Sequence, residues 1–231
     1  MYFPSGIVDP IPLMGIFTPC SLAALYRHCG PIYALGAALT PLGWASLTGL
    51  DAGQHGNRVY DAVDHFGPDA DLLARDLHEA RIADAFDLPD AVRRLGLFVE
   101  AHLKPVNSRH ARLIALVMEW LSERSDWKLD ALHAMVGYSE RQVQRPTQRY
   151  FGLPPKALLR KSRALRAAAM FSNPRATEEQ LRSVADHFYD QSHMIREIRL
   201  FAGRTPGRLR ELRNDELSRR IGAGLRETAQ D

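Results

Sequence analysis

The spacing of hydrophobic residues changes near residue 69, from short runs to the repeat of amphipathic helices. Before that point, apolar residues form runs bounded by Gly and Pro, over residues 11–18 and 32–40. Such runs predict short buried strands. The sequence Pro41-Leu-Gly-Trp44 indicates a turn into a short helix at about residues 44–50. We therefore expect a small α+β region over residues 1–68.

Three helices are predicted between residues 69 and 126. Asp69 can cap a helix that runs to His78, and Asp87 followed by Pro89 is typical of the next helix start. That second helix carries one apolar stripe, made of Val92, Leu95, Val99 and Leu103. A strongly apolar helix is expected over residues 108–122, and a linker is expected over residues 122–126, where the charge balance changes sign.

After residue 127 the pattern repeats one unit twice, a short helix, a tight turn and a second helix. In the first unit, a helix over residues 129–136 ends at Gly137, and Ser139 with Gln142 forms a capping box for the next. A longer helix is expected from Pro155 through Met170.

The second unit opens with another capping box, Thr177 with Gln180. Apolar stripes mark its two helices, Leu181, Val184, Ala185 and Phe188 in one, and Met194, Ile195, Ile198 and Phe201 in the other. Gly203 is expected to end the second helix, and Thr205-Pro206 to open a last short one. A polar tail follows residue 213.

A helix–turn–helix unit presents its second helix to the major groove of DNA, and two such units must lie about 34 Å apart to occupy one face of a duplex. A plain helical bundle shares all of these periodicities. The pattern alone therefore leaves a DNA-binding domain and a helical bundle both open.

Charge is unevenly distributed along the 231 residues. The net charge of +3 combines an acidic front, with 10 basic and 15 acidic residues up to residue 126, and a basic back, with 20 and 12. Of the basic residues in the back, 17 are Arg and three are Lys. An excess of Arg favours recognition of phosphates and guanine edges.

Two sequence segments carry a resemblance to a known family. Residues 132–167 read LHAMVGYSERQVQRPTQRYFGLPPKALLRKSRALRA, with the pieces G-x-S-x-R-x-x-x-R and F-G-x-x-P-K. Residues 184–209 read VADHFYDQSHMIREIRLFAGRTPGRL. Both segments resemble the DNA-binding domain of AraC-family transcription regulators. The resemblance implies a sequence-specific DNA-binding transcription regulator that is mainly α, with two helix-turn-helix units joined by a linker helix in its C-terminal domain.

The front of the chain resembles that family more loosely. The element G-x-x-L-x-P-L-G-W, from Gly36 to Trp44, is similar to part of the sensor-like N-terminal domain of some members. This implies a small α+β N-terminal domain that senses a signal or mediates dimerisation. Phe17, Tyr33 and Trp44 are expected in its core or around an apolar pocket. The expected domains are 1–68, a helical connector over 69–126, the DNA-binding domain over 127–213 and a polar tail over 214–231.

The resemblance and the helix geometry together indicate which side chains contact DNA. The base-reading candidates are Arg141, Gln144 and Arg145 in the first unit and Gln191, Ser192, His193 and Arg196 in the second. The candidates for phosphate contacts are Arg149, Lys156, Arg199 and Arg204. Arg suits guanine O6 and N7, and Gln suits adenine N6 and N7, whereas phosphate contacts position the protein without reading sequence.

The first unit departs from the family pattern more than the second. Pro146 interrupts the first recognition helix, Thr147 replaces a large apolar residue, commonly Phe, and His133 replaces a small one. In the second unit Phe188 replaces the usual turn Gly. We therefore expect the second unit to dominate DNA affinity. The alternative is a ligand-sensing or protein-interaction module whose first helix-turn-helix is degenerate.

Enzymatic and metal-binding readings find little support in the motifs. The chain contains no G-x-S-x-G, P-loop or G-x-G-x-x-G, and its nine histidines form no H-E-x-x-H. Cys20 and Cys29 have no zinc-site spacing. We expect neither an enzyme nor a cofactor. We also expect a cytoplasmic protein, because the first residues lack the basic stretch and following apolar stretch of a secretory signal. Candidate partners besides double-stranded DNA are RNA polymerase, a small-molecule effector and a second copy of the chain, and a membrane is not expected.

Overall fold

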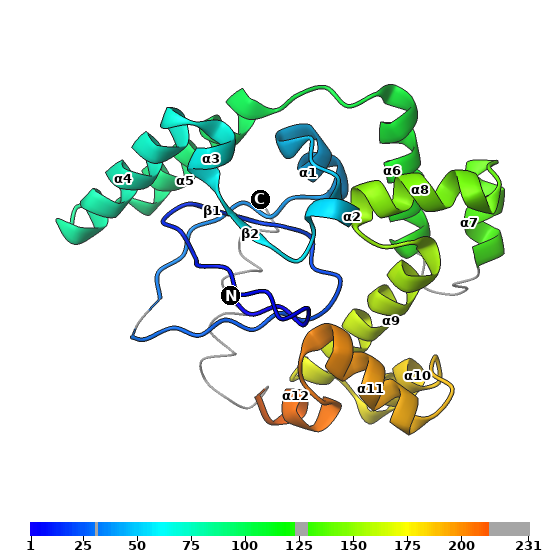
Figure 1. The fold of residues 1–231 in the computed structure, drawn as a ribbon. Coiled ribbons are helices and arrows are strands. Elements are labelled where there is room, and N and C mark those ends of the chain that lie inside the picture. The colour runs from blue at the N-terminus through cyan, green and yellow to red at the C-terminus, as the bar shows by residue number, and fades with distance from the viewer. Residues whose placement is uncertain (31, 123–128, 213–231) are drawn as a thin grey trace. The chain divides into compact units, whose positions relative to one another are not determined.

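The computed structural model describes residues 1–30, 32–122 and 129–212, and this part is mainly helical (Figure 1). The elements are β1 (Gly15–Phe17), α1 (Pro41–Thr48), α2 (Ala52–His55), β2 (Val59–Asp61), α3 (Ala62–Phe66), α4 (Pro68–Ile82), α5 (Leu88–His102), α6 (Ser108–Ser122), α7 (Leu129–Val136), α8 (Glu140–Phe151), α9 (Pro155–Ser172), α10 (Glu178–Ala185), α11 (Gln191–Ala202) and α12 (Pro206–Leu212). Within these ranges, no helix is long and apolar enough to cross a membrane.

The chain forms two compact units, and the division between them falls after Lys156, near the start of α9. The first unit holds the elements up to α8 and the first two residues of α9, and the second holds the rest of α9 with α10, α11 and α12. The expected boundaries at residues 68 and 126 stay predictions. The expected tail over 214–231, and most of the expected linker over 122–126, lie outside the described residues.

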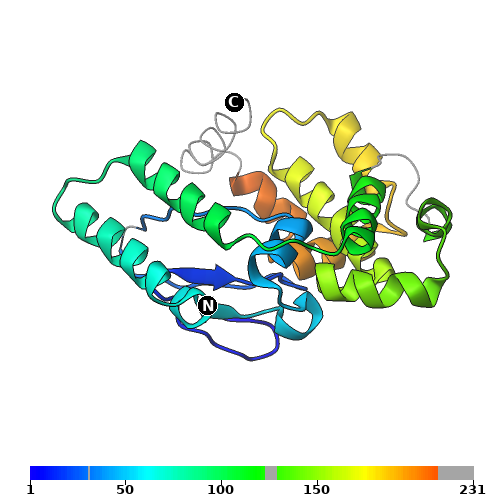
Figure 2. The ribbon, with the colours of Figure 1, turned by 90° about the horizontal axis from the view of Figure 1, so that it is seen from above.

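The N-terminal region contains a small antiparallel sheet of β1 and β2, whose strands are drawn as arrows in Figure 2. In this sheet Ile16 lies opposite Tyr60. Ile16 and Trp44 pack with small residues of α2 and α3 and with Phe98 of α5 in one buried cluster. Asp9 fixes the first residues to β2, because its carboxylate accepts hydrogen bonds from the Val59 backbone N–H at 2.8 Å and from the Arg58 guanidinium at 2.8 and 3.0 Å. These bonds hold the pKa of Asp9 below its ordinary value, although burial of the carboxylate opposes this.

The prediction of a strand over residues 32–40 is wrong. This segment has no regular secondary structure, and Tyr33 is 73% exposed. The apolar run of residues 11–18 forms a strand only at Gly15–Phe17, where β2 pairs with it. A strand requires a hydrogen-bonded neighbour, and a local apolar run does not supply one. Of the three aromatics expected together, Trp44 is buried but Phe17 and Tyr33 are exposed, so they line no common pocket.

The helices α4 and α5 exist as predicted, with two corrections. Gly67 rather than Asp69 is the N-cap of α4, because Pro68 takes its first position. In α5 the buried face contains Ala91 and Phe98, whereas Val92 and Leu103 of the predicted stripe are exposed.

The first helix-turn-helix unit, α7 and α8, has the predicted bounds, and so does α6. Gly137 and Gly152 end α7 and α8 with positive φ angles of 65° and 77°, which glycine adopts without steric cost. At the start of α8, the Gln142 side-chain oxygen accepts hydrogen bonds from the Ser139 backbone N–H and hydroxyl at 3.1 and 3.0 Å. The local capping signals therefore fix the bounds of these helices.

Helix α8 continues through Pro146. A proline there removes the N–H that would bond to the carbonyl of Gln142, yet the helix runs five residues further to Phe151. Thr147, fully buried beside it, donates its hydroxyl hydrogen to the Val143 carbonyl at 2.7 Å. The buried hydroxyl is thus satisfied within the helix, and Thr147 packs where the family resemblance implies a larger apolar side chain.

The second compact unit has its own core. Phe171 of α9, Leu181 of α10 and Met194 and Ile198 of α11 pack together with Phe188 from the turn between α10 and α11. The capping box at α10 is confirmed, since the Gln180 N–H donates to the Thr177 hydroxyl at 3.2 Å and the Thr177 N–H donates to the Gln180 side chain at 3.0 Å. The remaining inward side chains of this core are Ala167, Ala168 and Leu209.

The prediction that Ile195 of α11 lies in the core is wrong. Ile195 is 36% exposed, whereas Met194, Ile198 and Phe201 are buried. These three follow the spacing of one helix face, and Ile195 lies one residue to the side of it.

We predict that the Pro146→Ala substitution raises the free energy of unfolding by about 1–3 kcal/mol, because it restores a backbone donor inside α8 and removes the clash of the proline ring. Urea denaturation of the full chain measures this change. The matched control is Pro41→Ala at the start of α1, where no donor is needed. Equal shifts for the two variants would show that Pro146 is unstrained in its helix.

Candidate nucleic-acid interface

The second recognition helix, α11, has one buried and one exposed face. Its N-cap is Asp190, whose carboxylate accepts a hydrogen bond from the His193 backbone N–H at 2.6 Å. Gln191, Ser192 and Arg196, three of the predicted base readers, are exposed on the outer face. The cap and the buried stripe together determine which side of the helix these polar side chains occupy.

A buried ion pair holds α11 against α9. Glu197 of α11 is only 3% exposed and accepts two hydrogen bonds from the Arg160 guanidinium of α9, at 2.6 and 3.2 Å. Burial by itself raises the pKa of Glu197, but the hydrogen bonds and the positive charge of Arg160 outweigh it and lower that pKa below its ordinary value. The carboxylate is therefore ionised, and it fixes α11 on the linker helix.

His193, the remaining predicted base reader of α11, occupies a different environment from the other three. Its Nε2 lies 3.8 Å from a Glu197 carboxylate oxygen, and its ring is edge-on to Phe188 at 6.0 Å between centroids. Its Nδ1 is buried and has no hydrogen-bond partner among the described residues. The ring therefore lies between the exposed face and the ion pair, and base reading by His193 stays a prediction.

Sequence reasoning missed the polar cluster beneath α11. Besides Arg160 and Glu197 it includes Arg163, whose guanidinium lies over the Phe188 ring at 4.9 Å and whose pKa is lowered by burial. One signal was available, because Glu197 occurs beside Ile198 and three residues after Met194, on an otherwise apolar stripe. An acidic residue in such a position indicates a buried ion pair.

The first recognition helix, α8, also divides its residues by face. Val143, Thr147 and Tyr150 are buried, whereas the predicted base readers Arg141, Gln144 and Arg145 are exposed. Gln148 continues this exposed face one turn further. Its spacing of three residues from Arg145 is a sequence signal that it shares a helix face with the predicted base readers.

The predicted DNA contacts share one electrostatic property. All the basic ones are exposed, and within the described ranges none of them forms an ion pair; they are Arg141, Arg145, Arg149, Lys156, Arg196, Arg199 and Arg204. Other arginines of the second unit are paired, such as Arg208 with Glu211 and Arg210 with Glu178. The unpaired charges are therefore available to phosphates and base edges.

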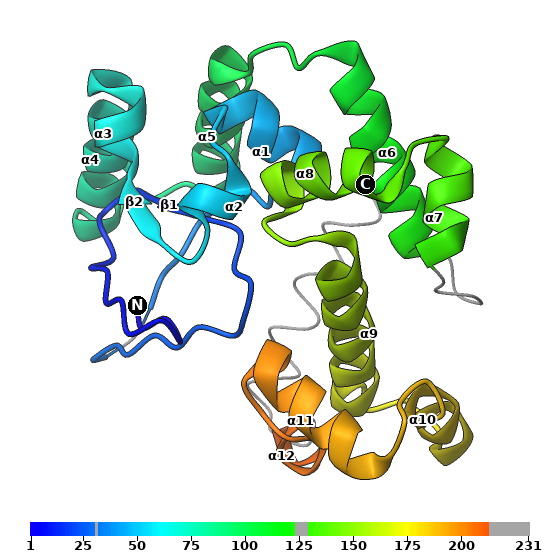
Figure 3. The same ribbon diagram turned by 45° about the vertical axis from the view of Figure 1, so that its right-hand side comes forward.

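Helix α2 packs against the C-terminal part of α8 inside the first unit, as Figures 1 and 3 both show. The contact is close, because a Cβ on Gly53 would lie 3.1 Å from the Gln148 carbonyl oxygen and one on Gly152 would lie 3.2 Å from the Ala52 carbonyl oxygen. On the other side of α8, the Tyr150 hydroxyl is hydrogen-bonded to His110 Nδ1 of α6 at 2.7 Å. The recognition helix is thus held from two sides by the region that precedes it.

We predict that Glu197→Gln lowers the free energy of unfolding near neutral pH by about 1–3 kcal/mol, because it removes the charge from a buried hydrogen-bonded pair. Since the folded pKa of Glu197 is depressed, its stabilisation is present above the ordinary value of about 4.3 and is lost as the pH falls through the folded pKa. The difference between variant and wild type should therefore shrink in acid. Protection of the α11 amides against hydrogen exchange measures it.

The control for this prediction is Glu211→Gln, which removes an exposed ion pair with Arg208 worth less than about 1 kcal/mol. The stabilisation would not belong to the ionised Glu197 if the difference in unfolding free energy between wild type and Glu197→Gln stayed constant from neutral pH to about pH 3.

The region that contains both recognition helices is similar to a known family. Residues 132–212 match the model of a family described as a helix-turn-helix domain. No curated protein and no solved structure matches the chain. The matched residues begin within α7 and end with α12, so they include both helix pairs and the linker helix. Residues 132–212 are an AraC-type helix-turn-helix domain, the DNA-binding domain of a transcription regulator.

Proposed function

We propose that the protein is a sequence-specific transcriptional regulator that inserts α8 and α11 into successive major-groove segments of one DNA site. The observation that carries this proposal is the shared design of the two helices. Each buries a mainly apolar face and exposes a polar face, whose guanidinium groups form no ion pair within the described residues. Such a face is what major-groove recognition requires.

Base reading is assigned to the outer faces of the helices. Arg141 and Arg145 of α8 and Arg196 of α11 can each donate two hydrogen bonds to a guanine. Gln144 and Gln191 can bind an adenine edge in the same bidentate manner, while Ser192 and His193 complete the set near the start of α11.

The two helix-turn-helix units are joined by α9, a linker helix of 18 residues that is about 27 Å long. Arg149, Lys156, Arg199 and Arg204 are the proposed phosphate contacts. Since each phosphate contact releases counterions from DNA, affinity should fall steeply as salt increases.

The proposal is tested by selecting bound duplexes from a random-sequence library with the full chain at physiological salt. We expect an asymmetric site with two conserved boxes about one helical turn apart. One conserved box would contradict the use of both units. Bulk binding without sequence enrichment would favour the alternative, a ligand-sensing or interaction module with a degenerate first unit.

Two arginines of α11 should have different effects on binding. Arg196→Ala should cost about 1–3 kcal/mol on the selected site and relax specificity at one base position. Arg199→Ala should weaken binding to all sequences alike and lower the slope of log affinity against log salt by about one. Fluorescence anisotropy measures both, with the ion-paired Arg208→Ala as the variant that leaves binding unchanged. Identical effects of Arg196→Ala and Arg199→Ala would contradict the division of roles.

We also propose that the second unit dominates affinity, because Pro146 lies within the first recognition helix. Pro146→Arg adds a positive side chain to α8 and removes the proline, and it should increase affinity for the selected site. Anisotropy titration of the variant and of wild type measures the gain. An unchanged dissociation constant would show that Pro146 does not limit the first unit.

A further inference from the structure

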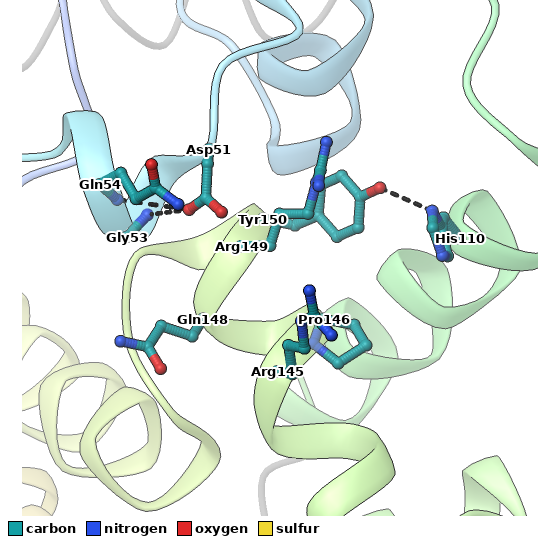
Figure 4. A pocket seen from close by; sticks show the side chains of 9 residues that line it. All are labelled: Asp51, Gly53, Gln54, His110, Arg145, Pro146, Gln148, Arg149 and Tyr150. Carbon is teal, nitrogen blue, oxygen red and sulfur yellow. Dashed lines mark hydrogen bonds between the residues drawn. The ribbon is translucent and has the colours of Figure 1, made fainter.

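A cavity of about 580 Å³ lies where α2, α6 and α8 meet, all within the first compact unit (Figure 4). Its volume falls in the range of small-molecule sites, which is roughly 300–1,000 Å³. The lining differs from that of a typical apolar ligand pocket. It is made of Asp51, Gly53 and Gln54 near α2, His110 of α6, and Arg145, Pro146, Gln148, Arg149 and Tyr150 of α8.

The charges around this cavity do not balance. Arg145 and Arg149 both line it, and within the described part of the chain neither guanidinium has an ion-pair partner. Asp51 is the acidic member of the lining, but its carboxylate caps α2 and accepts hydrogen bonds from the backbone of Gly53 and Gln54 at 2.8 and 3.3 Å. The lining thus holds two guanidinium groups and one carboxylate, whose Oδ1 accepts both of these hydrogen bonds, so its net charge favours an anion.

The walls of the cavity are built from packed backbone. Gly53 allows α2 to approach the Gln148 carbonyl, and Ala52 beside it is buried. The hydrogen bond between Tyr150 and His110 fixes the opposite wall. These contacts hold the backbone of the walls in place, whereas the side chains of Arg145 and Arg149 are exposed at the rim.

We propose that this cavity binds a small anionic metabolite that carries a carboxylate or a phosphate group, and that the bound anion antagonises DNA binding. Guanidinium groups bind both kinds of anion through paired, charge-assisted hydrogen bonds. The antagonism rests on the proposed function, because Arg145 is there a base reader and Arg149 a phosphate contact. A guanidinium that is bound to the metabolite is not available to DNA.

The site itself is tested by titrating the full chain with citrate and, separately, with inorganic pyrophosphate in an isothermal calorimeter. The two probes distinguish a carboxylate from a phosphate ligand. We expect saturable binding of at least one probe and a loss of about tenfold in affinity, one lost charge-assisted contact, for Arg149→Gln. The control is Arg141→Gln, an exposed arginine of the same helix outside the cavity. No binding of either probe, or equal losses in the two variants, would overturn the proposal.

The antagonism is tested with Gln54→Trp, which fills the cavity from α2 without changing a proposed DNA contact. Anisotropy titrations compare DNA affinity in the binding probe and in chloride at equal ionic strength. We expect the probe to weaken wild-type binding about tenfold more than chloride does, and the variant to respond to both salts alike. Equal responses of wild type would overturn the antagonism. Calorimetry uses no DNA, so a failure of the proposed function would leave the cavity result interpretable.

Discussion

The helices of the two helix-turn-helix units are too short to be stable in water by themselves. The helices α7 and α10 have eight residues and α8 and α11 have 12, about the length below which even good helix formers are marginal. Each therefore depends on caps at its ends and on the burial of one face. The same requirement leaves the opposite face exposed, and the unpaired arginines of the recognition helices lie there.

The two recognition helices obtain this support from different sources. Helix α11 is held by the core of its own unit and by the ion pair between Glu197 and Arg160, all within residues that follow Lys156. Helix α8 is held by α1, α2 and α6, which precede it in the chain. A change in the packing of α1, α2 or α6 therefore acts on α8 directly.

Local signals explain why the helices after residue 108 could be predicted closely. Gly137, Gly152 and Gly203 end helices with positive φ angles, and two capping boxes start them. Strand pairing and the packing of α2 on α8 depend instead on partners far away in the sequence, so the run over 32–40 was misread and the cavity had no sequence signal. Gln191, Ser192 and Arg196 of α11 are exposed as the pattern predicts, but the acid beneath them, Glu197, was missed because helix periodicity treats buried positions as apolar.

The excess of arginine in the back half overstates the charge that can reach DNA. Arg160 neutralises a buried carboxylate, and Arg208 and Arg210 pair with Glu211 and Glu178. Composition counts these arginines together with those that have no partner. Only an unpaired guanidinium can replace counterions at a phosphate without first breaking an existing ion pair. The positive charge of the back half thus indicates a nucleic-acid partner, but the pairing of individual arginines determines which helix faces can bind it.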